Sequence, residues 1–345
     1  MPQTRLHGRP MDSNLIEIRG LVAEFRTEAG PVRALNGINM AIPRGRTLAV
    51  LGESGCGKSV TAQCILNLVR HPGRITAGTI HYSGGAAPID IATLSPTSET
   101  MRRIRGAEIA MIFQEPMTSF DPLFTVGDQI VEMLQAHDRK LPKTEARARA
   151  IAMLGRVRLP SPELIVDRYP HQLSGGMRQR VMIALALSCD PKLLIADEPT
   201  TALDVTTESQ ILDLLRELQA QMGMSILFIT HDLGVASEMA DEVIVMYLGY
   251  VVEQGPAGQV LTDPHHPYTR ALMESVPKLG AAAGGRLNAI KGMVPTPDQM
   301  PPGCPFHTRC TAFIPGRCDR VLPDLWPAGD GRLSRCHLSA PGAAT

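Results

Sequence analysis

One glycine-rich segment of the sequence ends in a lysine and a hydroxyl, GESGCGKS at residues 52–59. It matches the pattern G-x-x-x-x-G-K-[ST], in which backbone N–H groups surround phosphate oxygens, the lysine reaches the terminal phosphates and the hydroxyl binds Mg²⁺. For the segment taken alone, a simple glycine-rich turn before a helix is the alternative. The residues that we expect to contact a nucleotide here are Gly52, Glu53, Ser54, Gly55, Cys56, Gly57, Lys58, Ser59 and Val60.

Two adjacent carboxylates, Asp197 and Glu198, follow the apolar run LLIA later in the chain. A carboxylate at the end of a buried strand can hold Mg²⁺ through water, and its neighbour can polarise the water that attacks a phosphate. An acidic strand end without function is the alternative. Behind a phosphate-binding loop, the pair predicts phosphoryl transfer to water.

The segment LSGGMRQR, residues 173–180, places Ser174, Gly175 and Gly176 at the start of a predicted helix. The free N–H groups and the dipole of such a start make it a second candidate anion site. Taken alone, a serine N-cap with a flexible turn is the simpler interpretation.

Four of the seven cysteines lie close together near the end of the chain with the spacing C-x5-C-x7-C-x17-C. These are Cys304, Cys310, Cys318 and Cys336. Thiolates in such a segment can bind zinc or an iron–sulfur cluster, and the spacing alone leaves inert thiols and adventitious disulfides open. His307 and His337 are weaker candidates as ligands.

The elements that must position these residues alternate between strands and helices. The predicted strands are 14–25, 34–42, 47–51, 193–197, 225–232 and the hairpin 242–255. The predicted helices are 59–69, most of 128–190 and a segment that ends near Gly223. This order predicts an α/β core with a parallel sheet, interrupted by a helical insert.

Composition narrows the class of protein further. Lys and Arg total 34, Asp and Glu total 34, and aromatic residues are 4% of the 345 residues. A neutral chain with few aromatics lacks the basic face and the stacking platforms of nucleic-acid-binding proteins, so we expect no nucleic-acid partner. The first residues contain no apolar core of a signal peptide, and no apolar run is long enough to cross a bilayer.

The phosphate loop, LLIADE and LSGGM together resemble the ATP-binding subunits of ABC transporters, whose signature is LSGGQ; Met177 replaces its glutamine. The resemblance implies that Gln114 senses Mg²⁺ and the attacking water, that Asp204 crosses a dimer interface, and that His231 contacts the γ-phosphate. It further implies that Phe25 stacks on adenine, for which a core position is the alternative.

The roles that follow from this resemblance fall into two groups. Catalysis is expected from Glu198, His231 and Gln114, and Mg²⁺ ligation from Ser59, Gln114 and Asp197. The two phosphate sites belong to opposite subunits in this family, so Ser174, Gly175 and Gly176 are expected to face ATP held by a second subunit.

Longer segments resemble the dipeptide/oligopeptide (peptide/nickel) importer subfamily: 111–130, 194–206, 246–255, 266–279 and 303–318. The resemblance implies an ATPase domain over 14–265, with an N-terminal antiparallel β subdomain and a helical subdomain at about 120–190, followed by a cysteine-rich extension over 266–345. It favours a [4Fe–4S] cluster over zinc or no metal at the four cysteines.

The same resemblance implies the partners and the location. We expect a homologous second ATPase, two membrane permeases and an extracytoplasmic binding protein. A helix of the permease is expected to dock on residues 115–124. The subunit would lie peripherally on the cytoplasmic face of the inner membrane. Importers of nickel, glutathione, opines or sugars share these motifs and stay as alternatives.

Two other classes of ATPase or nucleotide-binding protein fit the sequence less well. Soluble ABC ATPases that act on DNA or ribosomes usually carry long coiled coils, inserted zinc modules or tandem cassettes, and the sequence has none of these patterns. A regulator without turnover commonly loses a catalytic residue, whereas Glu198 and His231 are both present. The transport ATPase is therefore the leading prediction.

Overall fold

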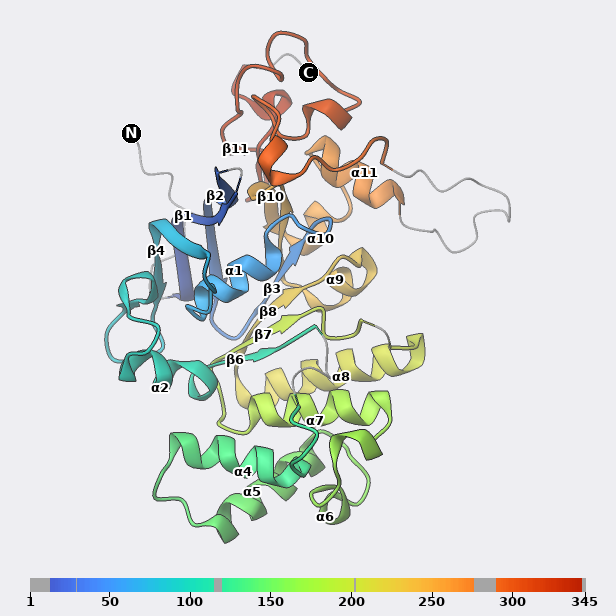
Figure 1. Cartoon of the computed structure of the whole chain (residues 1–345). Coiled ribbons are helices and arrows are strands. Elements are labelled where there is room, and N and C mark those ends of the chain that lie inside the picture. The colour runs from blue at the N-terminus through green and yellow to red at the C-terminus, as the bar shows by residue number, and fades with distance from the viewer. Residues whose placement is uncertain (1–12, 29, 115–119, 202, 276–289, 343–345) are drawn as a thin grey trace.

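The structure is a computed structural model that describes residues 13–28, 30–114, 120–201, 203–275 and 290–342. Two sheets and a group of helices form its main parts (Figure 1). The N-terminal sheet is antiparallel, and the larger sheet is mixed. This arrangement confirms the predicted fold class, an α/β core with an N-terminal antiparallel subdomain and a helical subdomain.

The N-terminal sheet has the strand order β2–β1–β4–β5. Its strands are β1 (Asn14–Thr27), β2 (Gly30–Pro43), β4 (Gly73–Tyr82) and β5 (Ile89–Asp90). Alternating residues of β1, such as Ile16 and Ile18, are fully buried, because successive side chains of a strand point to opposite faces. The predicted strands 14–25 and 34–42 are confirmed.

The larger sheet has the order β11–β12–β10–β9–β3–β8–β7–β6. Its strands are β3 (Thr47–Leu51), β6 (Ile109–Ile112), β7 (Leu193–Asp197), β8 (Ser225–Ile229), β9 (Glu242–Tyr247), β10 (Tyr250–Pro256), β11 (Trp326–Pro327) and β12 (Leu333–Ser334). The five strands from β9 to β6 pair in parallel, and β3, β7 and β8 are buried throughout, as expected for strands covered on both faces. Their carboxyl ends therefore meet at one edge.

The helices are α1 (Lys58–Ile65), α2 (Glu99–Ala107), α4 (Val126–His137), α5 (Lys143–Arg156), α6 (Pro162–Ile165), α7 (Gly175–Leu187), α8 (Val205–Met222), α9 (Leu233–Met239), α10 (Ala257–Val260) and α11 (Pro267–Ser275). Helices α4 to α7 form the predicted helical insert (Figure 1). Gly223 ends α8 with φ +64, the left-handed conformation that glycine adopts most readily. Within the described residues, no helix combines the length and the apolar character that a membrane crossing requires.

Helix α1 is shorter than the predicted helix 59–69. The chain leaves the helix at Asn67, whose φ is +50. The Arg105 guanidinium donates hydrogen bonds to the carbonyl oxygens of Leu66 and Asn67, at 2.7 and 2.8 Å. Carbonyls at a helix end need such partners, and the apolar pattern of the sequence contains no sign of this distant arginine.

The cysteine-rich extension packs on the ATPase sheet. Strand β12 pairs with β10, and the Arg335 main-chain N–H and guanidinium donate to the carbonyl oxygens of Val252 and Val251, at 2.7 and 2.9 Å. A buried apolar cluster joins Tyr247 of β9 to Tyr268 and Phe306 of the extension. The domain boundary at residue 265 stays a prediction, since a sheet crosses it.

Candidate active site

The carboxyl ends of four parallel strands supply the predicted catalytic residues. The phosphate loop follows β3, Gln114 follows β6, Glu198 follows β7 and His231 follows β8. Because these strands are neighbours in one sheet, residues far apart in sequence lie close together at this edge. Ligands of open α/β sheets bind at this edge as a rule.

The phosphate loop is shaped by glycines that no other residue replaces without strain. Gly57 has φ +105, and a Cβ there would lie 2.8 Å from the Ala34 carbonyl oxygen and from the Leu35 side chain. Lys58 is 6% exposed, and its Nζ donates to the carbonyl oxygens of Gly52 and Glu53 at 2.7 and 3.2 Å. The ammonium group thus contacts the backbone of the phosphate loop, where it is predicted to bind the terminal phosphates.

The other loop residues divide by exposure. Ser54 and Gly55 are exposed, so their backbone is open to a ligand, and Ser59 and Val60 are half-buried at the start of α1. The Cys56 side chain is 2% exposed and lies in the apolar cluster beneath the loop, where burial raises the pKa of its thiol. Any contact of Cys56 with a nucleotide would therefore come from its backbone.

Asp197 and Ser59 form a pair suited to a divalent cation. Asp197 is 5% exposed, the Ser59 hydroxyl hydrogen-bonds to its carboxyl, and its Oδ1 has no hydrogen-bond partner. Burial raises the pKa of Asp197. An unpartnered buried carboxylate oxygen beside a hydroxyl is the hard oxygen donor set that Mg²⁺ prefers, so these residues fit the predicted metal.

Glu198 lies at the centre of the predicted catalytic residues. Its carboxylate accepts hydrogen bonds from Gln114 Nε2 at 2.9 Å and Thr201 Oγ1 at 3.1 Å, and its Oε1 lies 3.2 Å from His231 Nδ1. Its backbone has φ +48, a conformation that is costly for a residue with a Cβ and that recurs at functional sites. The structure thus brings Gln114, Glu198 and His231 together.

The second candidate anion site lies at the N-terminus of α7, within the helical subdomain (Figure 1). Ser174 caps the helix by accepting from the Met177 N–H at 3.4 Å, and Ser174 and Gly175 are exposed. A Cβ on Gly176 would lie 2.9 Å from Thr207 Cγ2. The exposed helix start is therefore open to a group from outside the chain.

Asp204 caps α8 next to this segment. Its carboxylate accepts from the Thr207 N–H and Oγ1 at 3.0 and 2.7 Å, and these hydrogen bonds lower its pKa. The residue is exposed, as a dimer-interface residue would be in a single subunit. Its role at an interface stays a prediction.

Phe25 lies half-buried on β1, opposite Gly73 of β4. A Cβ on Gly73 would lie 2.5 Å from Phe25 Cε1, so the ring packs over the glycine. Gly73 thus leaves room for the ring on this side, and stacking of Phe25 on adenine stays a prediction.

Several residues that contact the site carry no sequence motif. The Gln179 amide, 1% exposed, donates to the carbonyl oxygen of Pro199, which follows Glu198. From the extension, Tyr268 and Arg309 both bond to Glu53 of the phosphate loop. Gln179 belongs to the segment LSGGMRQR, which is the only sequence signal for it. No local sequence pattern indicates that Tyr268 or Arg309 contacts the phosphate loop.

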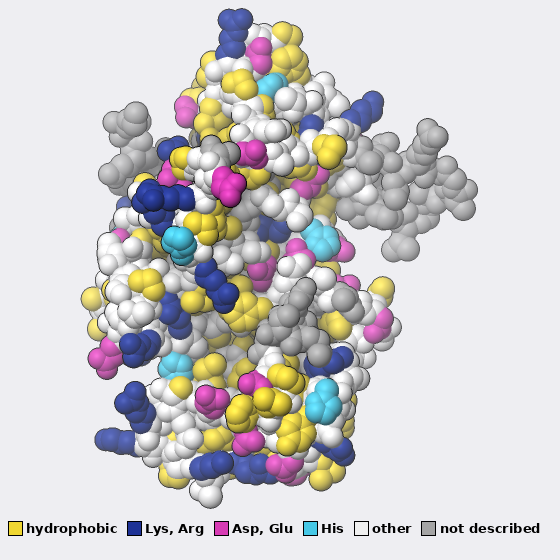
Figure 2. Space-filling view, viewed as in Figure 1, with side chains coloured by type: hydrophobic (Ala, Val, Ile, Leu, Met, Phe, Trp, Pro, Cys, Tyr) yellow, Lys and Arg dark blue, Asp and Glu magenta, His cyan; other side chains and the backbone are white. Residues whose placement is uncertain are grey.

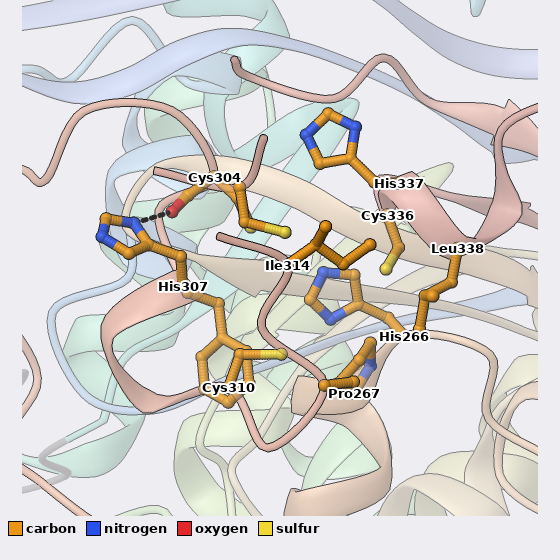
Figure 3. A pocket seen from close by; sticks show the side chains of 12 residues that line it. His266, Pro267, Cys304, His307, Cys310, Ile314, Cys336, His337 and Leu338 are labelled. Carbon is orange, nitrogen blue, oxygen red and sulfur yellow. Dashed lines mark hydrogen bonds between the residues drawn. The ribbon is translucent and has the colours of Figure 1, made fainter. Parts of the chain in front are cut away.

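The four clustered cysteines line one cavity of the extension. Figure 3 shows the sulfurs of Cys304, Cys310 and Cys336 directed toward the same space, and Cys318 also lines it. All four are free thiols, and burial, together with the other three thiols, raises the pKa of Cys304 to about 12. His307 and His337 line the cavity, but His307 Nδ1 donates to the carbonyl oxygen of Cys304 and His337 Nε2 donates to that of Val321.

The predicted metal site is not confirmed by this geometry. Within the described ranges, no group of three or more His, Cys, Asp and Glu side chains is placed so that it could hold a metal ion. The four thiols share a cavity without converging as ligands of one ion. Neither zinc nor a [4Fe–4S] cluster is therefore supported by the placement of the described side chains, and the cavity that the thiols share is the observation that remains for the cluster.

The charged surface agrees with the composition. On the face seen in Figure 2, Lys and Arg side chains are interspersed with Asp and Glu side chains. The predicted docking segment 115–124 lies partly outside the described residues, which exclude 115–119. The described part of it exposes Leu123 and Phe124.

Comparison with known proteins adds two family matches and several relatives. Residues 35–201 match the ABC transporter family, and residues 252–318 match the oligopeptide/dipeptide transporter C-terminal region. The oligopeptide transport ATP-binding protein AppD of Bacillus subtilis is 48% identical over 327 residues, which cover 94% of this chain and 97% of AppD.

Two solved structures are similar in fold. An ATP-binding cassette in a dimeric post-hydrolysis state, bound to ADP and Pi, has a TM-score of 0.62 at 28% identity and covers 70% of this chain and 98% of its own. The cbiO1 protein of Clostridium perfringens, part of the ABC transporter complex cbiONQ, has a TM-score of 0.61 at 31% identity, covering 73% and 92%.

Proposed function

The chain belongs to the ATP-binding subunits of ABC transporters and is an ATPase, and from this premise we propose that it powers the import of di- or oligopeptides. The match of residues 252–318 to the peptide-transporter C-terminal region carries the peptide assignment. The name of AppD, a relative over nearly the whole chain, supports it. Nickel, glutathione, opine and sugar importers are outcomes that the test below distinguishes.

The proposed hydrolysis uses positioning and charge rather than a covalent intermediate. The phosphate loop holds the phosphates of ATP, and Lys58 leaves the carbonyls of Gly52 and Glu53 to contact them. The Glu198 carboxylate accepts a hydrogen bond from the attacking water and orients it. Gln114 and Thr201 hold that carboxylate in place, and His231 approaches the γ-phosphate.

Ser59 and Asp197 would hold Mg²⁺, with Gln114 as a further ligand. When bound, Mg²⁺ neutralises phosphate charge and polarises the transferred group. The buried, unpartnered Oδ1 of Asp197 is the observation that supports this assignment. Asp197 binds the ion in its ionised form, which the raised pKa of the buried carboxyl opposes until a cation is present.

The proposed assembly places two ATPase subunits head to tail beneath two permeases. The exposed Ser174 and Gly175 and the half-buried Gly176 of each subunit would face ATP on the phosphate loop of the other, and Asp204 would lie between them. The similar cassette of known structure is dimeric. In this assembly the chain lies peripherally on the cytoplasmic side of the membrane, and an extracytoplasmic binding protein delivers the solute.

We also propose a [4Fe–4S] cluster at Cys304, Cys310, Cys318 and Cys336. In such a cluster each cysteine binds a different iron, so four thiols surround a volume instead of converging on one ion. The shared cavity supports that arrangement. Iron and acid-labile sulfide in anaerobically purified protein would be lost in Cys304→Ala and kept in Cys189→Ala, which lies outside the cavity. Wild-type protein without iron would refute the cluster.

The test of the import function uses the reconstituted transporter with its two permeases and binding protein in liposomes. We expect di- or oligopeptides to stimulate ATP hydrolysis and to accumulate inside. Stimulation by nickel, glutathione, opines or sugars, and not by peptides, would assign the alternative substrate. ATPase activity stimulated by DNA or ribosomes and not by any transported solute would refute a transport role.

A further inference from the structure

The cysteine-rich extension contacts the phosphate loop directly through Arg309. Its guanidinium forms a two-point ion pair with Glu53, with Nη1–Oε2 at 2.7 Å and Nη2–Oε1 at 3.0 Å. We infer that Arg309 is a positioning residue, which fixes and neutralises the Glu53 carboxylate and thereby sets the affinity of the loop for ATP. The inference rests on the ATP-binding part of the proposed function and is independent of the solute.

The electrostatic reason lies in the position of Glu53. It is the second residue of the phosphate loop, between Gly52 and the exposed Ser54, and its side chain is 25% exposed. The phosphates of ATP carry several negative charges, so an unpaired carboxylate in the same loop repels them. A guanidinium bound through both nitrogens removes that repulsion and also holds the side chain in one orientation.

Arg309 is itself held firmly by the extension and by β9. Its side chain is 4% exposed, Nε donates to the Lys291 carbonyl oxygen at 3.2 Å, and Nη1 contacts the Tyr247 hydroxyl at 3.3 Å. The guanidinium also lies over the rings of Tyr247 and Phe306, at 5.8 and 6.0 Å. A cation with so many fixed contacts is preorganised and needs little reordering when a nucleotide binds.

A second contact from the extension supports the loop backbone. The hydroxyl of Tyr268, which is fully buried, accepts the Glu53 main-chain N–H at 2.9 Å. Glu53 is therefore bound at both its backbone and its carboxylate by residues more than 200 positions away. Arg309 also directly precedes Cys310 of the four-cysteine cavity, so the fold around that cavity places the guanidinium.

The test measures equilibrium ATP binding by the purified full-length chain, without turnover. We expect Arg309→Ala to weaken ATP binding roughly tenfold, the equivalent of about 1.4 kcal/mol. Glu53→Gln in the same background removes the unpaired charge, so most of the lost affinity returns. The matched control is Arg332→Ala: Arg332 is also buried in the extension but bonds to Asp263 and Asp330, so ATP affinity is expected to stay unchanged.

Each outcome decides a different question. No loss of affinity in Arg309→Ala, an equal loss in Arg332→Ala, or a loss that Glu53→Gln leaves uncorrected would overturn the inference, the last because it indicates only a folding role. If Arg309→Ala is insoluble, Arg309→Lys must show a smaller loss that Glu53→Gln also corrects. Wild-type protein that binds no ATP would instead refute the proposed function.

Discussion

The side-chain amide of Gln114 donates a hydrogen bond to the Glu198 carboxylate at 2.9 Å, across 84 residues of sequence. The contact exists because β6 and β7 are parallel neighbours whose carboxyl ends point to the same edge. His231 reaches the other oxygen of the same carboxylate from β8. One carboxylate thus receives a side chain from each neighbouring strand, which suits a group that must be oriented toward water.

Glu198→Gln is expected to bind ATP normally and to hydrolyse it at least about a hundredfold more slowly, because the amide cannot accept a proton from water. The measurement is phosphate release by the assembled transporter, with ATP binding measured in parallel. Glu132→Gln, at an exposed position of α4, is the control and keeps the wild-type rate. Hydrolysis at the wild-type rate in Glu198→Gln would show that another group activates the water.

Asp197→Asn is expected to make the nucleotide-free protein more stable at neutral pH while abolishing Mg²⁺-dependent hydrolysis. Burial raises the pKa of Asp197 above its ordinary 3.8, so the folded protein binds this proton more tightly than the unfolded chain does. The free energy of unfolding of the wild type therefore falls as the pH rises from the pKa of Asp197 in the unfolded chain to its higher pKa in the folded protein. Above the folded-state pKa it stays at the lower value. The variant lacks this loss.

Denaturant unfolding in Mg²⁺-free buffer at several pH values measures the difference. The stability gain of Asp197→Asn is largest above the raised pKa and shrinks on acidification toward 3.8. A gain that does not change with pH would mean that charge burial is not its cause.

Gly57→Ala is expected to lose ATP binding and to destabilise the fold by more than Gly55→Ala. Both glycines have positive φ, so each alanine incurs backbone strain of about 1–2 kcal/mol. At Gly57 the new Cβ also meets the Ala34 carbonyl at 2.8 Å, whereas at Gly55 it meets nothing within 4 Å. Thermal unfolding and ATP titration of both variants check this; equal losses would mean that the close packing under Gly57 has no effect.

Phe25→Leu is expected to weaken ATP binding roughly tenfold while leaving thermal stability near the wild-type value, because stacking on a base contributes about 1–3 kcal/mol. Leucine keeps apolar contact with Gly73 but has no aromatic face. Phe25→Trp should retain the affinity. Unchanged ATP binding in Phe25→Leu, with lower stability, would make Phe25 a core residue only.

The parts of the site that the sequence predicts are those formed by contiguous residues. The phosphate loop needs only a strand, its glycines and a helix in order, and Asp197 and Glu198 need only the end of a buried strand. The proximity of Gln114, Glu198 and His231 followed from the family resemblance, and the parallel strands provide its physical cause.

Other features depend on contacts that no local pattern contains. The early end of α1 depends on Arg105, and the ion pair with Glu53 depends on Arg309, which is 256 residues away. Periodicity reports which face of an element is buried, and it does not identify the distant side chain that meets a free carbonyl or carboxylate. A shared site for the four cysteines followed from the family resemblance, whereas the direction of their sulfurs required the fold.

The pairing of β12 and Arg335 with β10 has a consequence for the solubility of the ATPase part. A seven-residue strand at the end of a sheet offers unpaired N–H and C=O groups on which another chain can add a strand. Here β12 and the Arg335 donors cover that side of β10, and β11 pairs with β12. The outermost strand, β11, has two residues and is too short for another chain to pair with it. The extension therefore protects β10 from edge-to-edge pairing with another chain. A chain cut after β10 would expose this edge and is expected to aggregate.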